Sequence, residues 1–132
     1  MERGGVRPLV YIVEDDEPIR GELAEVLRRN GFEVAWCDSF DHVADDVLKA
    51  APDVVLLDLT LPVADGQLVC REIRQRSDVP IIVLTSRTTE IDEVMSMTMG
   101  ADDFVAKPYR ARVLVARIGA LLRRRGRPDE SS

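Results

Sequence analysis

Carboxylate side chains follow two of the apolar runs in this sequence. Glu14 and Asp15 come directly after the run 8–13, and Asp58 closes the run 53–58, which is apolar throughout its middle. Strands covered on both faces of a parallel sheet read as continuous apolar runs, and ligands bind at the carboxyl ends of such strands. If the first and third runs form neighbouring strands, three carboxylates converge at one edge of the sheet.

Three carboxylates in one pocket repel one another, and without a cation at least one of them would bind a proton. An all-oxygen ligand set suits a hard cation, and a site with few protein ligands suits Mg²⁺ better than Ca²⁺. The sequence contains no Asp-rich calcium loop. We therefore predict Mg²⁺ as the cofactor.

Asp58 is the carboxylate best placed for covalent chemistry, because it follows the most apolar run and would point into the centre of the cluster. A carboxylate there can act as a nucleophile toward phosphorus and form an aspartyl phosphate. Phosphoryl transfer also needs its phosphoryl oxygens neutralised. Two later strand ends offer the groups for this, the Thr85 hydroxyl and the Lys107 ammonium.

Five strand–helix units are expected to position these side chains. The predicted strands are 8–13, 32–37, 53–58, 79–84 and 104–107. Helices are predicted after each of them: from Pro18 to Asn30, from a cap at Asp38 or Ser39 to before Pro52, after the loop 61–66 through Leu68, Val69 and Ile73, over 88–99, and over 109–124. This alternation predicts an α/β fold with a parallel sheet and right-handed crossovers.

The composition indicates one soluble domain. The chain has 132 residues, of which 45% are apolar and 32% charged, with no apolar run long enough to cross a membrane and no signal peptide pattern. We therefore expect a cytoplasmic protein without membrane contact. Cys37 and Cys70 are far apart and are predicted to be reduced, packed thiols, and a lone His42 among acids argues against a histidine triad.

The charge is unevenly distributed. The formal net charge is -6, which argues against nucleic acid as the main partner of this domain, yet residues 110–127 hold seven arginines and no acid. We interpret this run as a solvated helix end, where cations lie favourably at the negative pole of the helix dipole, in preference to a DNA contact.

The motifs together resemble the receiver domain of two-component response regulators. The matching segments are Val13-Glu14-Asp15-Asp16, Asp58-Leu59-Thr60-Leu61-Pro62 with Asp65-Gly66, Leu84-Thr85-Ser86, and the run from Gly100 to Pro108. The resemblance covers 8–125, leaving 1–7 as an N-terminal tail and 126–132 as a tail or the start of a linker. It implies a doubly wound, flavodoxin-like, five-stranded sheet of order 2-1-3-4-5 with helices on both faces.

The resemblance also implies a role for each site residue. Asp58 would be phosphorylated by a partner histidine kinase. Mg²⁺ would be bound by Asp15, by Glu14 largely through water, by Asp58 and by the Thr60 main-chain carbonyl. Thr85 and Phe104 would be the switch pair, and Lys107 would contact the phosphoryl group ahead of a cis bond to Pro108. The domain would be a phosphoacceptor, able at most to catalyse its own phosphorylation and dephosphorylation, and not an enzyme acting on a separate substrate.

Within this family, the chain looks most like the OmpR/PhoB class. That class dimerises on phosphorylation through the fourth helix, fifth strand and fifth helix, and carries a DNA-binding domain after the receiver. The class usually pairs a basic residue with a Glu across the dimer, but here those positions are Glu93 and Val113, so that salt bridge cannot form. The expected dimer surface is Ile91, Val94, Met95 and Val113, with Asp102, Asp103, Arg112 and Arg117 as possible ion pairs.

Three other functions remain open from the sequence. The chain could be a stand-alone receiver that acts by protein–protein contact, although a piece preceding a DNA-binding domain is favoured. It could be a phosphorylation-independent interaction module, against which the complete set of acids argues. A phosphohydrolase of the haloacid-dehalogenase type would need a second Asp two residues after the nucleophile, where this chain has Thr60.

Overall fold

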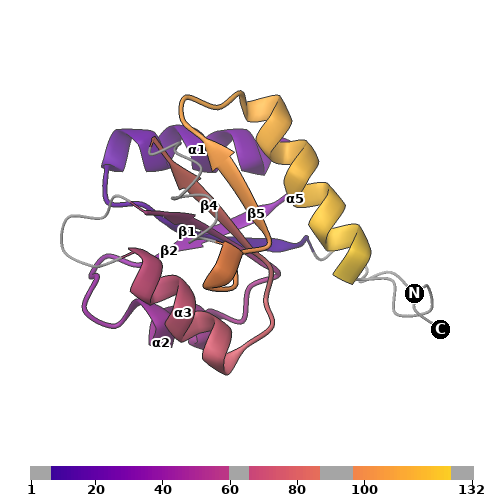
Figure 1. Cartoon of the computed structure of the whole chain (residues 1–132). Helices are drawn as coiled ribbons and strands as arrows, with labels where there is room; N and C mark the ends of the chain where they lie inside the picture. Colours follow the sequence, from indigo (N-terminus) through magenta and orange to yellow (C-terminus); the bar gives the residue numbers. More distant parts are fainter. Residues whose placement is uncertain (1–6, 60–65, 87–96, 126–132) are drawn as a thin grey trace.

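The protein is described here by a computed structural model, which covers residues 7–59, 66–86 and 97–125 (Figure 1). Its five strands are β1 (Leu9–Val13), β2 (Glu33–Trp36), β3 (Val54–Asp58), β4 (Ile81–Thr85) and β5 (Asp103–Ala106). The helices within the described ranges are α1 (Glu17–Arg29), α2 (Val43–Ala50), α3 (Gly66–Arg76) and α5 (Ala111–Arg125). All strand pairs are parallel and the order is β2-β1-β3-β4-β5, which confirms the predicted fold.

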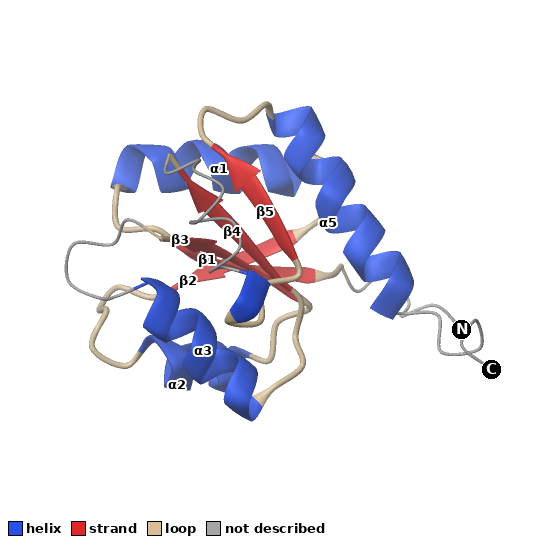
Figure 2. Ribbon diagram, viewed as in Figure 1, coloured by secondary structure: helices blue, strands red, loops and turns tan. Residues whose placement is uncertain are grey.

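The sheet lies between two layers of helices. Figure 2 shows α1 and α5 on one face of the sheet and α2 and α3 on the other. Alternate residues of each strand serve the two faces: in β3, Val55 and Leu57 pack in the cluster with α2 and α3, whereas Val54 and Leu56 pack in the cluster with α1 and α5. All five residues of β3 are buried, which explains why its sequence is apolar up to Asp58.

The first helix begins and ends as its sequence predicts. The Asp16 side chain accepts a hydrogen bond from the Ile19 N–H at 3.0 Å, and Pro18 occupies the first turn, where a missing N–H has no cost. Asn30 is the C-cap, and Gly31 follows with a positive φ of 92°. Asp16 therefore serves the helix and leaves Glu14 and Asp15 for other chemistry.

The predicted cap of the second helix is wrong. The helix begins at Val43, and His42 at the N-cap position makes no side-chain capping bond. The Ser39 hydroxyl instead donates to the Asp41 carboxylate at 3.2 Å and accepts from the Asp41 N–H at 3.3 Å. Ser and Asp form such local bonds in competition with helix, so α2 starts later than the capping residues suggested.

Other boundaries differ from the sequence prediction by a residue or two. β4 begins at Ile81 and not at residue 79, because Pro80 has no N–H to donate to the sheet; its carbonyl still accepts from Val55 N–H at 2.9 Å. Most of the predicted helix 88–99 lies outside the described residues. In the described part of the chain, no helix has the length and apolar character needed to cross a membrane.

Candidate functional site

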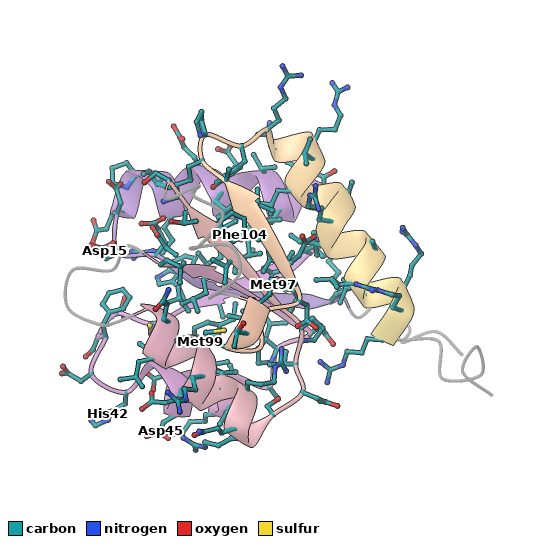
Figure 3. The ribbon with its side chains drawn as sticks, viewed as in Figure 1. Asp15, His42, Asp45, Met97, Met99 and Phe104 are labelled. Carbon is teal, nitrogen blue, oxygen red and sulfur yellow. The ribbon has the colours of Figure 1, made fainter. Side chains whose placement is uncertain are left out.

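Three carboxylates gather at the carboxyl end of the sheet. Glu14, Asp15 and Asp58 each offer an oxygen, and these oxygens lie within 4.8 Å of one another. Figure 3 shows Asp15 at the end of the sheet toward which the β4 and β5 arrowheads of Figure 1 point. This end of β1 and β3 is the topological switch point of the sheet, where doubly wound folds bind their ligands.

The register of the sheet explains why these side chains meet. Val13 of β1 pairs with Leu57 of β3, so the next residues, Glu14 and Asp58, lie side by side. Both also continue the alternation that directs side chains to the α1 and α5 face, as Lys107 does after Val105. Glu14, Asp58 and Lys107 therefore share one face of the sheet as well as one end.

Lys107 makes a close contact with both buried acids. Its Nζ donates to Asp58 Oδ2 at 2.8 Å and lies 3.6 Å from Glu14 Oε1. The Lys107 N–H donates to the Thr85 carbonyl at 2.8 Å, which extends the β4–β5 pairing, and the bond to Pro108 is cis. The predicted amine thus lies against the predicted nucleophile.

Glu14 and Asp58 lie close together in the pocket and are shielded from water, which shifts the pKa of Glu14. Glu14 is 4% and Asp58 2% exposed, and burial together with the Asp58 carboxyl raises the pKa of Glu14 to about 7. The Asp16 N–H, which donates to Glu14 Oε2 at 3.2 Å, and the Lys107 charge act in the opposite direction. Burial opposes the charge on Lys107, but its hydrogen bond to Asp58 and the two acids raise its pKa.

Thr85 and Phe104 lie on the other side of the sheet from Lys107. Thr85 is fully buried at the end of β4 and has the strand parity of Ile81 and Val83, which pack toward α2 and α3. Phe104, labelled in Figure 3, is half-buried against the same cluster. The two predicted switch residues thus share a face of neighbouring strands.

The donor set fits Mg²⁺. Two buried carboxylates and a half-exposed third give an all-oxygen cluster with one side open to solvent, which suits a hard cation that keeps several waters. Lys107 alone carries a single charge against these acids, and a divalent cation would offset the remaining repulsion. Thr60, whose carbonyl was predicted as a further ligand, lies outside the described residues.

The predicted dimer surface is described only in part. Ile91, Val94 and Met95 lie outside the described residues, whereas Val113 is exposed and Arg112 also faces solvent. Two of the predicted acids have partners within the chain. Asp103 pairs with Arg117 at 3.0 Å, and Asp102 accepts from Arg74 at 2.7 Å and from the Ile81 N–H at 2.8 Å.

Arg74 and Arg20 make contacts within the protein that were not predicted from the sequence. Arg74 binds the carbonyls of Gly100 at 3.0 Å and Ser77 at 3.1 Å, so it joins α3 to the segment that enters β5. Arg20 binds the Glu14 carbonyl at 3.0 Å beside the acidic pocket. Arginines on amphipathic helices are common, and no pattern in the sequence separates these two from solvated ones.

Curated relatives and solved structures resemble this chain over most of its length. The sensory transduction protein RegX3 of Mycobacterium tuberculosis is 48% identical over 120 residues, which are 91% of this chain and 53% of the relative. The chain thus spans about half the length of the curated relatives it matches. The BeF3-activated N-terminal receiver domain of Klebsiella pneumoniae RstA superposes with a TM-score of 0.82 at 33% identity, covering 87% of this chain and 98% of that one. The N-terminal domain of the nisin resistance regulator NsrR gives 0.80 at 36%, covering 89% and 99%.

A family model gives the same result over the part of the chain that contains the motifs. The model that describes the response regulator receiver domain matches residues 10–119, a range that includes the acidic pocket, Thr85 and Lys107. The resemblance inferred from the strand-end motifs is confirmed, and the chain belongs to the family of response regulator receiver domains.

Proposed function

We propose that this domain is a phosphorylation-controlled switch in which Asp58 accepts a phosphoryl group from a sensor histidine kinase. Receiver domains of two-component systems receive phosphate from histidine kinases and bind Mg²⁺ at an acidic pocket. The observation that carries the proposal is the meeting of Asp58 with Glu14, Asp15 and the Lys107 ammonium at one strand end.

In the proposed reaction, an Asp58 carboxylate oxygen attacks the phosphorus of a phosphohistidine. The new P–O bond forms as the P–N bond breaks, and the ring leaves as neutral imidazole when its other nitrogen carries a proton. Lys107, now 2.8 Å from Asp58, shifts its hydrogen bond to a phosphoryl oxygen. Bound Mg²⁺ supplies positive charge against the phosphoryl oxygens. Glu14 and Asp15 are the residues proposed to hold it with Asp58.

The proposed switch follows from the added charge. A phosphoryl group brings about -1.5 to -2 charges, which the Thr85 hydroxyl and Lys107 move to meet. The Thr85 shift frees space on the α2 and α3 side of the sheet, into which Phe104 turns. Moving the equilibrium between two states from 1:99 to 99:1 takes about 5.5 kcal/mol of differential interaction. New hydrogen bonds to a charged group can supply much of this.

The output is proposed to be a homodimer formed through the fourth helix, β5 and α5, as in the OmpR/PhoB class. DNA would be contacted only through a further domain outside this chain, and the site of action would be the cytoplasm. Because Asp102 and Asp103 already have partners within the chain, apolar contacts such as Val113 would contribute more to the dimer than ion pairs.

Phosphorylation is tested directly by intact-mass measurement. The protein is incubated with Mg²⁺ and acetyl phosphate, a small-molecule phosphoryl donor, and we expect one added phosphoryl group. Asp58→Asn should remain unmodified because an amide is not a nucleophile toward phosphorus. An adduct that persists in Asp58→Asn, or none in the wild type, would refute the assignment.

A further inference from the structure

We infer that Arg20 is a positioning residue for the acidic pocket, which it serves by holding the turn from β1 to α1 against the face of Trp36. The inference rests on the proposed function in one respect, because it takes the pocket to be a Mg²⁺ site. Arg20 itself supplies no ligand oxygen. Its role is to fix the backbone from which Glu14 and Asp15 project.

The Arg20 side chain is largely shielded from water, whereas a solvated helix arginine would be exposed. Its side chain is 12% exposed, and its Nη1 donates to the Glu14 carbonyl at 3.0 Å. The Glu17 carboxylate, at 4.0 Å and largely exposed, is a distant ion pair. The short contact of this cation is therefore with the main chain of a pocket residue.

The Trp36 ring keeps this guanidinium in place. The Arg20 Cζ lies over the ring at 5.1 Å from its centroid, within the range of cation–π attraction. A planar fork that stacks on a ring and donates along its edge has little freedom left to rotate. Trp36 ends the edge strand β2, so the contact joins β2, α1 and the end of β1.

The turn that Arg20 holds is short and carries both metal-ligand candidates of β1. Glu14 follows the last residue of β1 and Asp16 caps α1, so Asp15 alone separates them. The Asp16 N–H donates back to the Glu14 carboxylate at 3.2 Å. Rotation of the Glu14–Asp15 peptide would break the Arg20 bond and displace the two carboxylates relative to Asp58.

The charge of Arg20 makes it possible to distinguish a positioning role from a purely electrostatic effect on Mg²⁺ binding. A cation beside the pocket disfavours a second cation, so its removal alone would strengthen Mg²⁺ binding. Loss of positioning would weaken Mg²⁺ binding, as loss of a residue that orients a metal ligand commonly does by about tenfold or more. The two roles predict opposite signs for the same substitution.

The first experiment measures Mg²⁺ affinity by calorimetry at a temperature where every variant is folded. We expect Arg20→Gln and Arg20→Lys both to weaken binding by about tenfold. Lysine keeps the charge but cannot both stack and donate as the fork does. The matched control is Arg28→Gln. The Arg28 Cζ lies 5.8 Å from the centroid of the same ring, but the Arg28 backbone lies about 12 Å further along α1 than that of Arg20. This variant should bind Mg²⁺ with the affinity of the wild type.

The second experiment uses the metal-free protein. Amide hydrogen exchange of Asp16, followed by NMR, should be several-fold faster in both Arg20 variants and unchanged in Arg28→Gln. Trp36→Leu should show the same change in smaller measure, and Trp36→Phe, which restores a ring, should reverse part of it.

Three results would overturn the inference: tighter Mg²⁺ binding in Arg20→Gln with wild-type affinity in Arg20→Lys, equal loss in Arg28→Gln, or unchanged Asp16 exchange in both Arg20 variants. If the wild type binds no Mg²⁺, the proposed function fails instead. The exchange measurements would then still decide whether Arg20 holds the turn.

Discussion

Lys107 has the same electrostatic task in the metal-free protein that a divalent cation would have in the loaded one. It offsets two carboxylates that are almost entirely buried, and its Nζ reaches both of them. Breaking a buried pair is costly because the acid that remains keeps its desolvation penalty after losing the charge that offset it. Without Lys107 or a bound metal cation, the crowded acids of the pocket would therefore lower the free energy of unfolding.

Lys107→Met is expected to lower the free energy of unfolding of the metal-free protein by about 3 kcal/mol. Saturating Mg²⁺ should restore part of this loss, because it neutralises the same carboxylates. Urea denaturation with and without Mg²⁺ measures both. Lys49→Met is the control, because Lys49 is exposed on α2 and should change stability by no more than about 0.5 kcal/mol. Equal effects of the two substitutions would contradict this account.

The buried thiols predict a loss of stability at high pH. Burial raises the pKa of Cys70 to about 11, above the ordinary value of 9.0. Between these values the unfolded thiol has released its proton and the folded one has not, so the free energy of unfolding falls as pH rises from about 9 to 11. Cys70→Ala removes this contribution. The free energy of unfolding of the wild type should therefore fall by roughly 1–2 kcal/mol more than that of the variant over this pH range. A constant difference would show that Cys70 titrates alike in both states.

At the scale of the elements, the site depends on how closely α3 approaches the end of β3. Gly66 begins α3, and a Cβ built on it would lie 2.7 Å from the Leu59 Cα and 2.9 Å from the Leu59 carbonyl oxygen. Both are backbone atoms next to Asp58, so neither can move without moving the predicted phosphoacceptor. The Asp-Gly motif is thus explained by space as well as by turn chemistry.

Two glycine substitutions test this packing against each other. Gly66→Ala should destabilise the protein by about 1–3 kcal/mol, because the clash is with backbone. Gly21→Ala should stabilise it by about 0.5–1 kcal/mol, since Gly21 lies exposed inside α1 with nothing within 4 Å of its Cβ position. Thermal unfolding measures both, and effects of the same sign would refute the packing argument.

At the scale of the whole molecule, the sheet separates two surfaces with different tasks. The α1 and α5 side holds Glu14, Asp58 and Lys107, whereas Thr85 and Phe104 lie toward α2 and α3. A change at Asp58 can therefore reach the opposite face through Thr85 at the end of β4, which pairs with β3 and β5 on its two sides. The arginines at the end of α5 are exposed in its last turn, as expected for a solvated helix end.

The proposed dimer gives a prediction at this scale. With Mg²⁺ and beryllofluoride, a phosphoryl analogue, the protein should dimerise, and Val113→Glu should prevent this by burying a charge in the interface. Leu68→Glu is the matched control: Val113 is 41% and Leu68 49% exposed, but Leu68 lies on α3, away from the proposed interface. Sedimentation velocity measures the association, and dimerisation of Val113→Glu would exclude α5 as the interface.

The strand ends of the sequence were enough to predict which residues would share a site. Apolar runs that are buried on both faces must be central parallel strands, and polar residues directly after them must lie at the carboxyl edge. Glu14, Asp15, Asp58 and Lys107 were placed by this reasoning, and the structure brings all four together.

Only the tertiary structure decided the side-chain contacts in which separate elements meet. The contact of Arg20 with the Trp36 ring and the Arg74 bond to the Gly100 carbonyl leave no periodic trace in the sequence. The physical reason is that burial pattern is a property of each strand or helix alone, whereas these contacts depend on how two or three such elements are packed.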